Sequence, residues 1–122
     1  MSENSTNSIL NTIKKMSGLD SEVKHFDTDI LVGINSSLST LYDLGVGPSD
    51  GFVIYSDSET WDELIGDRKY LHDVKTYVYL RTRLLFDPPT NSFLVSTIEN
   101  QIKELEWRLN AKTERRRDTW ME

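Results

Sequence analysis

The side chains of this chain that could do chemistry are few and stand far apart. The two histidines, His25 and His72, belong to no pattern such as His-x-x-x-His, which places two imidazoles on one helix face for a metal. No serine stands in G-x-S-x-G, and the chain has no cysteine. We therefore expect both histidines to lie on the surface or at helix ends, and no nucleophile or thiolate metal site.

Two short segments imitate binding loops without completing their patterns. Residues 57–62, DSETWD, carry acids as a calcium loop does, but no glycine follows at the sixth position and no bidentate glutamate closes the loop. Residues 45–51, GVGPSDG, are rich in glycine. They lack the lysine of a phosphate-binding loop, and their glycines do not have the G-x-G-x-x-G spacing of a dinucleotide-binding loop. The sequence thus predicts no catalytic, cofactor-binding or metal site, and it does not favour an enzyme.

Apolar periodicity predicts an all-α fold, a small bundle of three main helices and two short ones. The main helices are expected at residues 27–44, 69–86 and 92–110. One short helix follows from the apolar spacing of residues 9–16, and another from the capping-box spacing of Thr60 and Glu63. The expected core is Ile30, Ile34, Leu38, Leu41, Val74, Val78, Leu85, Leu94, Ile98, Ile102 and Leu105.

One short stretch, FVIY at residues 52–55, is β-branched and aromatic and is expected to be extended. No second strand is evident to pair with it, and an unpaired edge is a liability in a monomer, so it could pair between subunits. Trp107 stands on the flank of its helix stripe and suits a contact with a partner. The candidate subunit contacts are Phe52, Ile54, Trp61 and Trp107.

The length of the chain indicates one domain, and its net charge is negative but unevenly distributed between the two halves. The chain has 122 residues and a net charge of −6, but residues 20–67 carry eleven acids and one base, whereas residues 68–122 carry eleven bases and eight acids. No apolar run reaches the length of a membrane span, and the polar start does not resemble a signal peptide. We expect a protein made in the cytoplasm whose two halves face different surroundings or each other in neighbouring copies.

The order of these segments resembles that of the head–tail connector (adaptor) proteins of tailed bacteriophages of Gram-positive bacteria. The resemblance covers roughly residues 8–110. Its segments are ILNTIKKMSGLD, FDTDILVGINSSLSTLYDLGVGP, GFVIYSDSETWDELIGD, LHDVKTYVYLRTRLLFDPP and IENQIKELEWRLN. The most specific parts are LGVGP with its following GF, TWDELIGD, VKTYVYLRTRLLFDPP and ELEWRLN.

The resemblance implies a helical protomer that forms a homo-oligomeric ring, usually twelve-fold, under the portal protein of the virion. Such a ring extends the DNA channel at the head–tail junction, serves genome packaging and ejection, and offers a platform to the next neck (stopper) protein. It has no catalytic activity, no cofactor and no membrane partner, and DNA passes through it without specific binding. Two alternatives stay open: a nucleic-acid-binding packaging protein of the small terminase subunit type, and an assembly chaperone absent from the finished particle.

The chain is therefore expected to consist of a flexible leader at residues 1–7, a connector domain at residues 8–110 and a C-terminal docking tail at residues 111–122. The acids expected to line the channel are Asp50, Asp57, Glu59, Asp62 and Glu63. A wall that is negatively charged, as DNA is, does not bind the genome as it passes. The tail, which follows the end of the apolar stripe at Leu109, is expected to be exposed and to dock on the portal. Its docking residues are Arg115, Arg116, Arg117 and Trp120.

Overall fold

The computed structural model describes the backbone of residues 7–66 and 68–121, and the side chains of residues 7–66 and 69–113. Within that part the chain forms five helices and no strand. The helices are α2 (Ile9–Met16), α3 (Asp27–Asp43), α4 (Trp61–Leu64), α5 (Arg68–Phe86) and α6 (Ser92–Met121). The predicted all-α bundle with three main and two short helices is therefore confirmed, and residues 52–55 lie in neither helix nor strand.

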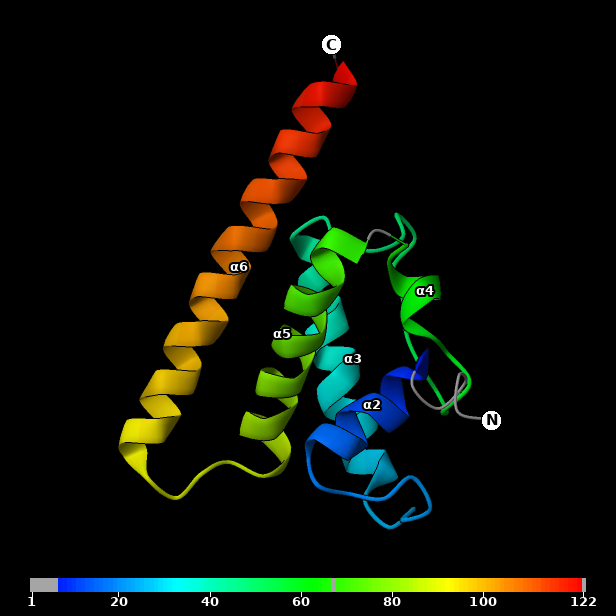
Figure 1. The fold of residues 1–122 in the computed structure, drawn as a ribbon, viewed down its shortest axis with the longest axis vertical. Coiled ribbons are helices and arrows are strands. Elements are labelled where there is room, and N and C mark those ends of the chain that lie inside the picture. Colours follow the sequence, from blue (N-terminus) through cyan, green and yellow to red (C-terminus); the bar gives the residue numbers. More distant parts are fainter. Residues whose placement is uncertain (1–6, 67, 122) are drawn as a thin grey trace.

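Helices α3, α5 and α6 run alternately up and down and form the body of the molecule, with α5 between the other two (Figure 1). Local signals fix where they begin and end. Asn91 caps α6 by accepting a hydrogen bond from the Phe93 amide at 2.8 Å, and Pro88 and Pro89 separate it from α5. Because these signals lie in the sequence itself, the predicted limits of α3 and α5 agree with the structure.

The contact between α3 and α5 is close because one glycine lies at the crossing. A Cβ atom built on Gly33 would stand 3.0 Å from Cγ2 and 3.2 Å from Cα of Thr82. Around this crossing the predicted stripes meet and are buried as expected: Ile30, Ile34, Leu38, Leu41, Val74 and Val78. The α3–α5 pair is thus the packed centre on which the other helices rest.

Helix α6 packs on α5 along one row of aliphatic side chains. The members of this row are Ile98, Ile102, Leu105 and Leu109, which are all buried. Leu85 and Leu94 share the same stripes, but they are 60% and 46% exposed, so their expected burial is wrong. Leu85 lies in the last turn of α5 and Leu94 in the first turn of α6, next to the loop that joins these helices at one end of the bundle (Figure 1).

The end of α6 also differs from expectation, because the helix continues from Ser92 to Met121 instead of ending near residue 110. No glycine or proline interrupts it there. Lys112, beyond the apolar row, is fixed by a 3.2 Å ion pair with Asp73 of α5. The side chains of residues 114–122 lie outside the described residues, and so do those of the expected docking set, Arg115, Arg116, Arg117 and Trp120. The expected leader, residues 1–7, is described only at Asn7.

Helix α2 is held against the beginning of α3 by a buried lysine. The Lys14 side chain is fully buried, and its ammonium donates hydrogen bonds to the carbonyl oxygens of Ser21, at 3.1 Å, and of Val23. Asp27 Oδ1, at the first residue of α3, stands 2.8 Å from the same ammonium and balances its charge. This single side chain thereby ties α2, the loop after it and α3 together.

Candidate functional site

The acidic loop, residues 50–63, is ordered largely by its own carboxylates. Glu63 accepts a hydrogen bond from the Thr60 amide at 2.9 Å, and Thr60 Oγ1 accepts one from the Glu63 amide at 3.2 Å, which completes the predicted capping box. Glu59 accepts the amide protons of Tyr55, at 3.0 Å, and Ser56, at 3.2 Å. These two acids therefore shape the loop in addition to any part in a channel wall.

The environment of Glu59 favours its charged form. Partial burial alone would raise the pKa of this carboxyl. The carboxyl also accepts hydrogen bonds from the amides of Tyr55 and Ser56 and from its own amide, and these bonds lower the pKa. On balance the pKa lies below the usual value of 4.5. Glu59 therefore carries a fixed negative charge at neutral pH.

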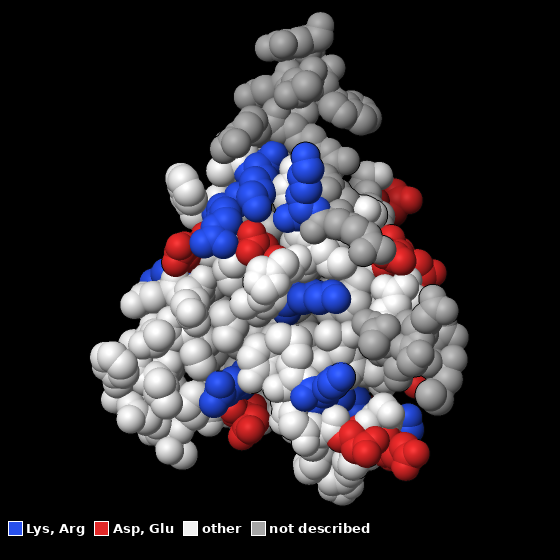
Figure 2. Space-filling view, in the orientation of Figure 1, with Lys and Arg blue, Asp and Glu red and all other residues white. Residues whose placement is uncertain are grey.

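The other three channel candidates are exposed acids. Asp50 and Asp57 are exposed, and Asp62 is exposed while it accepts a hydrogen bond from Asn7 Nδ2 at 3.1 Å. Acidic side chains stand along the right edge of the molecule, on the side of α4 (Figure 2). The structure thus gathers acids in one solvated region.

Residues 52–55 present alternate side chains to the core and to solvent. Ile54 is buried, and both its backbone groups bind the Asn35 side chain, which accepts from the Ile54 amide and donates to the Ile54 carbonyl, each at 2.9 Å. Val53 and Tyr55 point outward and are 51% and 80% exposed, while Phe52 is half-buried. Ile54 is therefore a core residue and not a subunit contact, and Val53 and Tyr55 offer the surface that was expected of it.

Trp61 is also part of the core, which corrects its expected role as a subunit contact. It is fully buried, its Nε1 donates to Thr12 Oγ1 of α2 at 3.0 Å, and the Lys75 ammonium stands 5.6 Å from its ring centroid. No local signal marks this burial, because the contact with Thr12 joins residues 49 positions apart in the chain. Trp107, by contrast, is 74% exposed and remains a candidate contact.

The outer face of α6, defined here by Phe93, Asn100, Lys103 and Trp107, is exposed along its length. Phe93 and Trp107 are each 74% exposed. Two acid–base pairs stand four residues apart on α6, Glu99 with Lys103 and Glu104 with Arg108. The Glu104–Arg108 ion pair forms at 3.0 Å, whereas no ion pair of Lys103 is found among the described side chains. This face therefore holds two large aromatic groups and a lysine directed to solvent.

The inner face of α6 is fastened to α5 by polar groups around the aliphatic row. The Tyr77 hydroxyl donates to Glu106 at 2.7 Å, and Arg81 donates to Tyr77 at 3.4 Å and to Ser36 of α3 at 3.2 Å. Burial, followed by the bond to Glu106, raises the pKa of Tyr77 to about 12. The tyrosine thus stays neutral, and this network links the three main helices.

A second polar cluster lies farther along the same contact. Asp73 of α5 is nearly buried and receives Arg108 and Lys112 of α6, each at 3.2 Å. The Lys112 ammonium also stands 5.5 Å from the centroid of the Tyr70 ring. These contacts hold α6 in place beyond the end of its apolar row.

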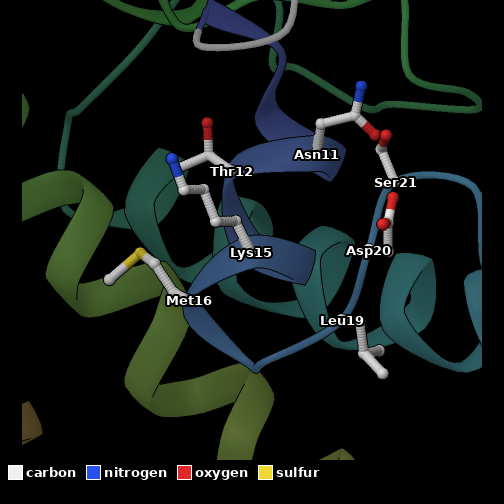
Figure 3. A pocket seen from close by; sticks show the side chains of 7 residues that line it. All are labelled: Asn11, Thr12, Lys15, Met16, Leu19, Asp20 and Ser21. Atoms are coloured by element: carbon white, nitrogen blue, oxygen red, sulfur yellow. The ribbon is translucent and has the colours of Figure 1, made fainter.

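The structure also contains an open hollow of about 430 Å³ beside α2. Its lining residues are Asn11, Thr12, Lys15, Met16, Leu19, Asp20 and Ser21. In Figure 3 Thr12, Lys15 and Met16 lie on one side and the other four side chains on the other side, and the two groups do not converge on a point. Nothing in this arrangement selects a ligand class.

The described side chains also form no metal site. His25 and His72 are both exposed, as expected, and the ring of His25 packs edge-on against Phe26 with 4.9 Å between ring centroids. No group of three or more histidine, aspartate or glutamate side chains in the described part is placed to hold an ion. Within the same part, no helix combines the length and apolar character that crossing a bilayer requires.

Comparison with known proteins identifies the family. Neither a curated protein nor a solved structure matches the chain significantly. The family model described as phage connector protein, however, matches residues 9–116, which is nearly the whole chain. This match covers all five helices in whole or in part, and it confirms the resemblance that the segment order suggested. The chain therefore belongs to the phage connector protein family.

Proposed function

We propose that this protein is the structural head–tail connector of a tailed phage, and that copies of it form a ring below the portal. The ring, twelve-fold as is usual for such connectors, extends the DNA channel and joins the capsid to the next neck protein and the tail. It stays in the virion at the head–tail junction and acts without catalysis. Membership of the phage connector family supports this proposal at the level of the family.

The observation that carries the ring is the number of large apolar side chains that the single chain leaves uncovered. Phe93 and Trp107 on the outer face of α6, and Tyr55 on the opposite side of the molecule, are each at least 74% exposed. Tryptophan, tyrosine and phenylalanine are enriched at the cores of protein–protein interfaces, so their exposure on two sides of the molecule supports contacts there. A ring would cover it because each copy receives a neighbour on both sides.

The acidic loop contributes to the channel wall in this proposal. Asp50, Asp57, Glu59, Asp62 and Glu63 stand in one stretch without a lysine or arginine between residues 50 and 63. A negative wall repels the phosphate backbone, whereas a basic wall would gain affinity from counterion release at each contact and slow the DNA. Glu59 is ionised at neutral pH, and the amides of Tyr55 and Ser56 hold its carboxylate in place.

The end of α6 docks on the portal. Its backbone is helical as far as Met121, and the Asp73 contacts of Arg108 and Lys112 fix the direction in which it leaves the bundle. In the sequence this end carries three consecutive arginines and a tryptophan, the residue types that contribute most at interface hot spots. A ring of identical ends would strengthen weak single contacts through avidity.

The ring is tested by electron microscopy and native mass measurement of the purified protein, alone and with purified portal protein. Rings of uniform size are expected, and the protein should be found in purified virions. A chain that remains monomeric even with the portal would overturn the proposal. Tight binding of duplex DNA with a steep salt dependence would favour the packaging-protein alternative instead.

Portal docking is tested separately by a deletion after Asn110 and by Trp120→Ala. Both variants should still form rings, because the contacts among α3, α5 and the apolar row of α6 are kept. Both should lose most of their binding to immobilised portal. Unchanged portal binding in the two variants would exclude this end of α6 as the docking element.

A further inference from the structure

We infer that the outer face of α6 in one copy packs on residues 53–57 of the next copy. This inference rests on the proposed ring and names the two surfaces that close it.

The outer face of α6 points directly away from its own bundle. Phe93, Asn100 and Trp107 follow one another at intervals of seven residues, so they lie in one line, and at 1.5 Å per residue the line is about 21 Å long. At about 100° per residue this line lies opposite the buried row that includes Ile98 and Ile102. The aromatic groups at its two ends therefore cannot be covered by the chain's own α5.

Residues 53–57 form a surface that is already ordered before any contact. Asn35 binds both backbone groups of Ile54, and Glu59 binds the amide of Tyr55, so the segment is fixed from two directions. Val53 and Tyr55 are held pointing outward as a result. Binding to such a surface costs little ordering entropy, which favours its use in a contact between subunits.

The two surfaces lie on opposite sides of the protomer. Helix α6 forms the left edge of the molecule and the segment before α4 forms the right edge, with α5 and α3 between them (Figure 1). A closed ring uses head-to-tail contacts, in which one side of each copy meets the other, different side of its neighbour. The apolar groups are distributed accordingly, with Phe93 and Trp107 on one side and Val53 and Tyr55 on the other.

The charges of the two surfaces are complementary. Lys103 stands beside the line of Phe93, Asn100 and Trp107, it is exposed, and no ion pair of it is found in the described part of the chain. Asp57 is exposed in a loop without a base. In the contact Asp57 faces Lys103 of the neighbour and is thereby removed from the proposed channel wall, which Asp50, Glu59, Asp62 and Glu63 still form. This pairing also sets the direction in which copies follow one another around the ring.

Cysteine cross-linking tests the contact directly, because the natural chain has no cysteine. Asn100→Cys changes an exposed residue on the outer face of α6, and Ser58→Cys changes the exposed residue directly after residues 53–57; both keep Lys103 and Asp57. Under oxidation with the portal present, each variant alone should stay uncross-linked, because like surfaces do not meet. A mixture of the two should give covalent dimers, and the double variant a ladder of higher oligomers. Ser39→Cys mixed with Asn100→Cys is the control and should give no dimer.

Charge reversal tests the pairing independently. Lys103→Glu or Asp57→Lys should each raise the concentration for half-assembly about tenfold, and the double variant should recover most of the assembly. Lys24→Glu, an exposed lysine elsewhere, should leave assembly unchanged. Rings that form without the mixed cross-link, or reversals without effect, would overturn this contact and leave the proposed function standing. Failure to form rings under any of these conditions would overturn the proposed function itself.

Discussion

Helix α5 contacts α3 and α6 in two different ways. On the α3 side a glycine lets the backbones approach, so that Gly33 and Thr82 are in direct contact. On the α6 side one aliphatic row is bordered by polar groups, and the far face of α6 is open to solvent. The comparison indicates that α3 and α5 form a fixed centre by close packing, whereas α6 is fastened along one face and leaves the other face for partners.

The largest effect is expected from a charge placed on the inner face of α6. Ile98→Asp puts an unpaired carboxylate into the α5 contact, which costs several kcal/mol, a large part of the stability of a small domain. We expect the folded state to be lost, as measured by circular dichroism and the thermal transition. Asn100→Asp, on the outer face of the same helix, should fold normally. Equal damage by both changes would contradict the division of α6 into two faces.

Lys14 places a buried charge between α2 and α3, so the packing around α3 is not apolar throughout. Lys14→Met keeps the length of the side chain but leaves Asp27 and the carbonyls of Ser21 and Val23 without their partner. Because Asp27 is partly exposed, we expect a loss of about 3 kcal/mol, at the lower end for a broken buried pair. Urea unfolding measures it, and Lys15→Met, at an exposed position, is the matched control. A loss below about 1 kcal/mol would show that the buried pair is dispensable.

Close packing of α3 on α5 is tested by one added methyl group. Gly33→Ala should lower the free energy of unfolding by about 2 kcal/mol, because the new Cβ would meet the Thr82 side chain and backbone. Gly66→Ala is the control, because nothing lies within 4 Å of a Cβ at that position. If Gly33→Ala were stabilising, as alanine normally is inside a helix, the contact would be looser than the structure shows.

The polar border of α6 is tested through its dependence on salt. Asp73→Asn should cost about 1 kcal/mol, because Arg108 and Lys112 lose their charge partner but are themselves partly exposed. The loss should shrink in 1 M salt, whereas the loss caused by Gly33→Ala should not. Hydrogen exchange should become faster at the C-terminal end of α6. An effect of Asp73→Asn that does not change with salt would argue against an electrostatic contact.

The smallest effect concerns the acidic loop and depends on pH. The pKa of Glu59 is lower in the folded protein than its usual 4.5, so the stabilising contribution of its charge is present above pH 4.5 and is lost as pH falls through the folded value. Glu59→Gln should therefore cost less than about 1 kcal/mol at pH 7, since the group is partly exposed, and this cost should shrink as pH falls below 4.5. Asp57→Asn is the control, with no effect at either pH. A cost of Glu59→Gln that stays constant from pH 7 to pH 3 would contradict this account.

The sequence by itself determined the helices, apart from the end of α6, together with the central core and the family. Their signals are local: apolar residues at helical spacing, the capping box at Thr60, the asparagine cap at Asn91 and the prolines after α5. Such signals depend on residues within a few positions of one another, so they can be read without the rest of the fold. The segments that resemble phage connectors are equally local, and the family match confirmed them.

Only the tertiary structure decided which of the predicted residues are covered. Leu85 and Leu94 fit the apolar stripes but stand where no neighbouring helix reaches them, whereas Ile54 and Trp61, expected at the surface, are covered by the bundle. The burial of Lys14 likewise requires three oxygen partners from a loop and another helix. Burial depends on contacts between segments distant in sequence, and periodicity gives the face of a helix but not what lies against it.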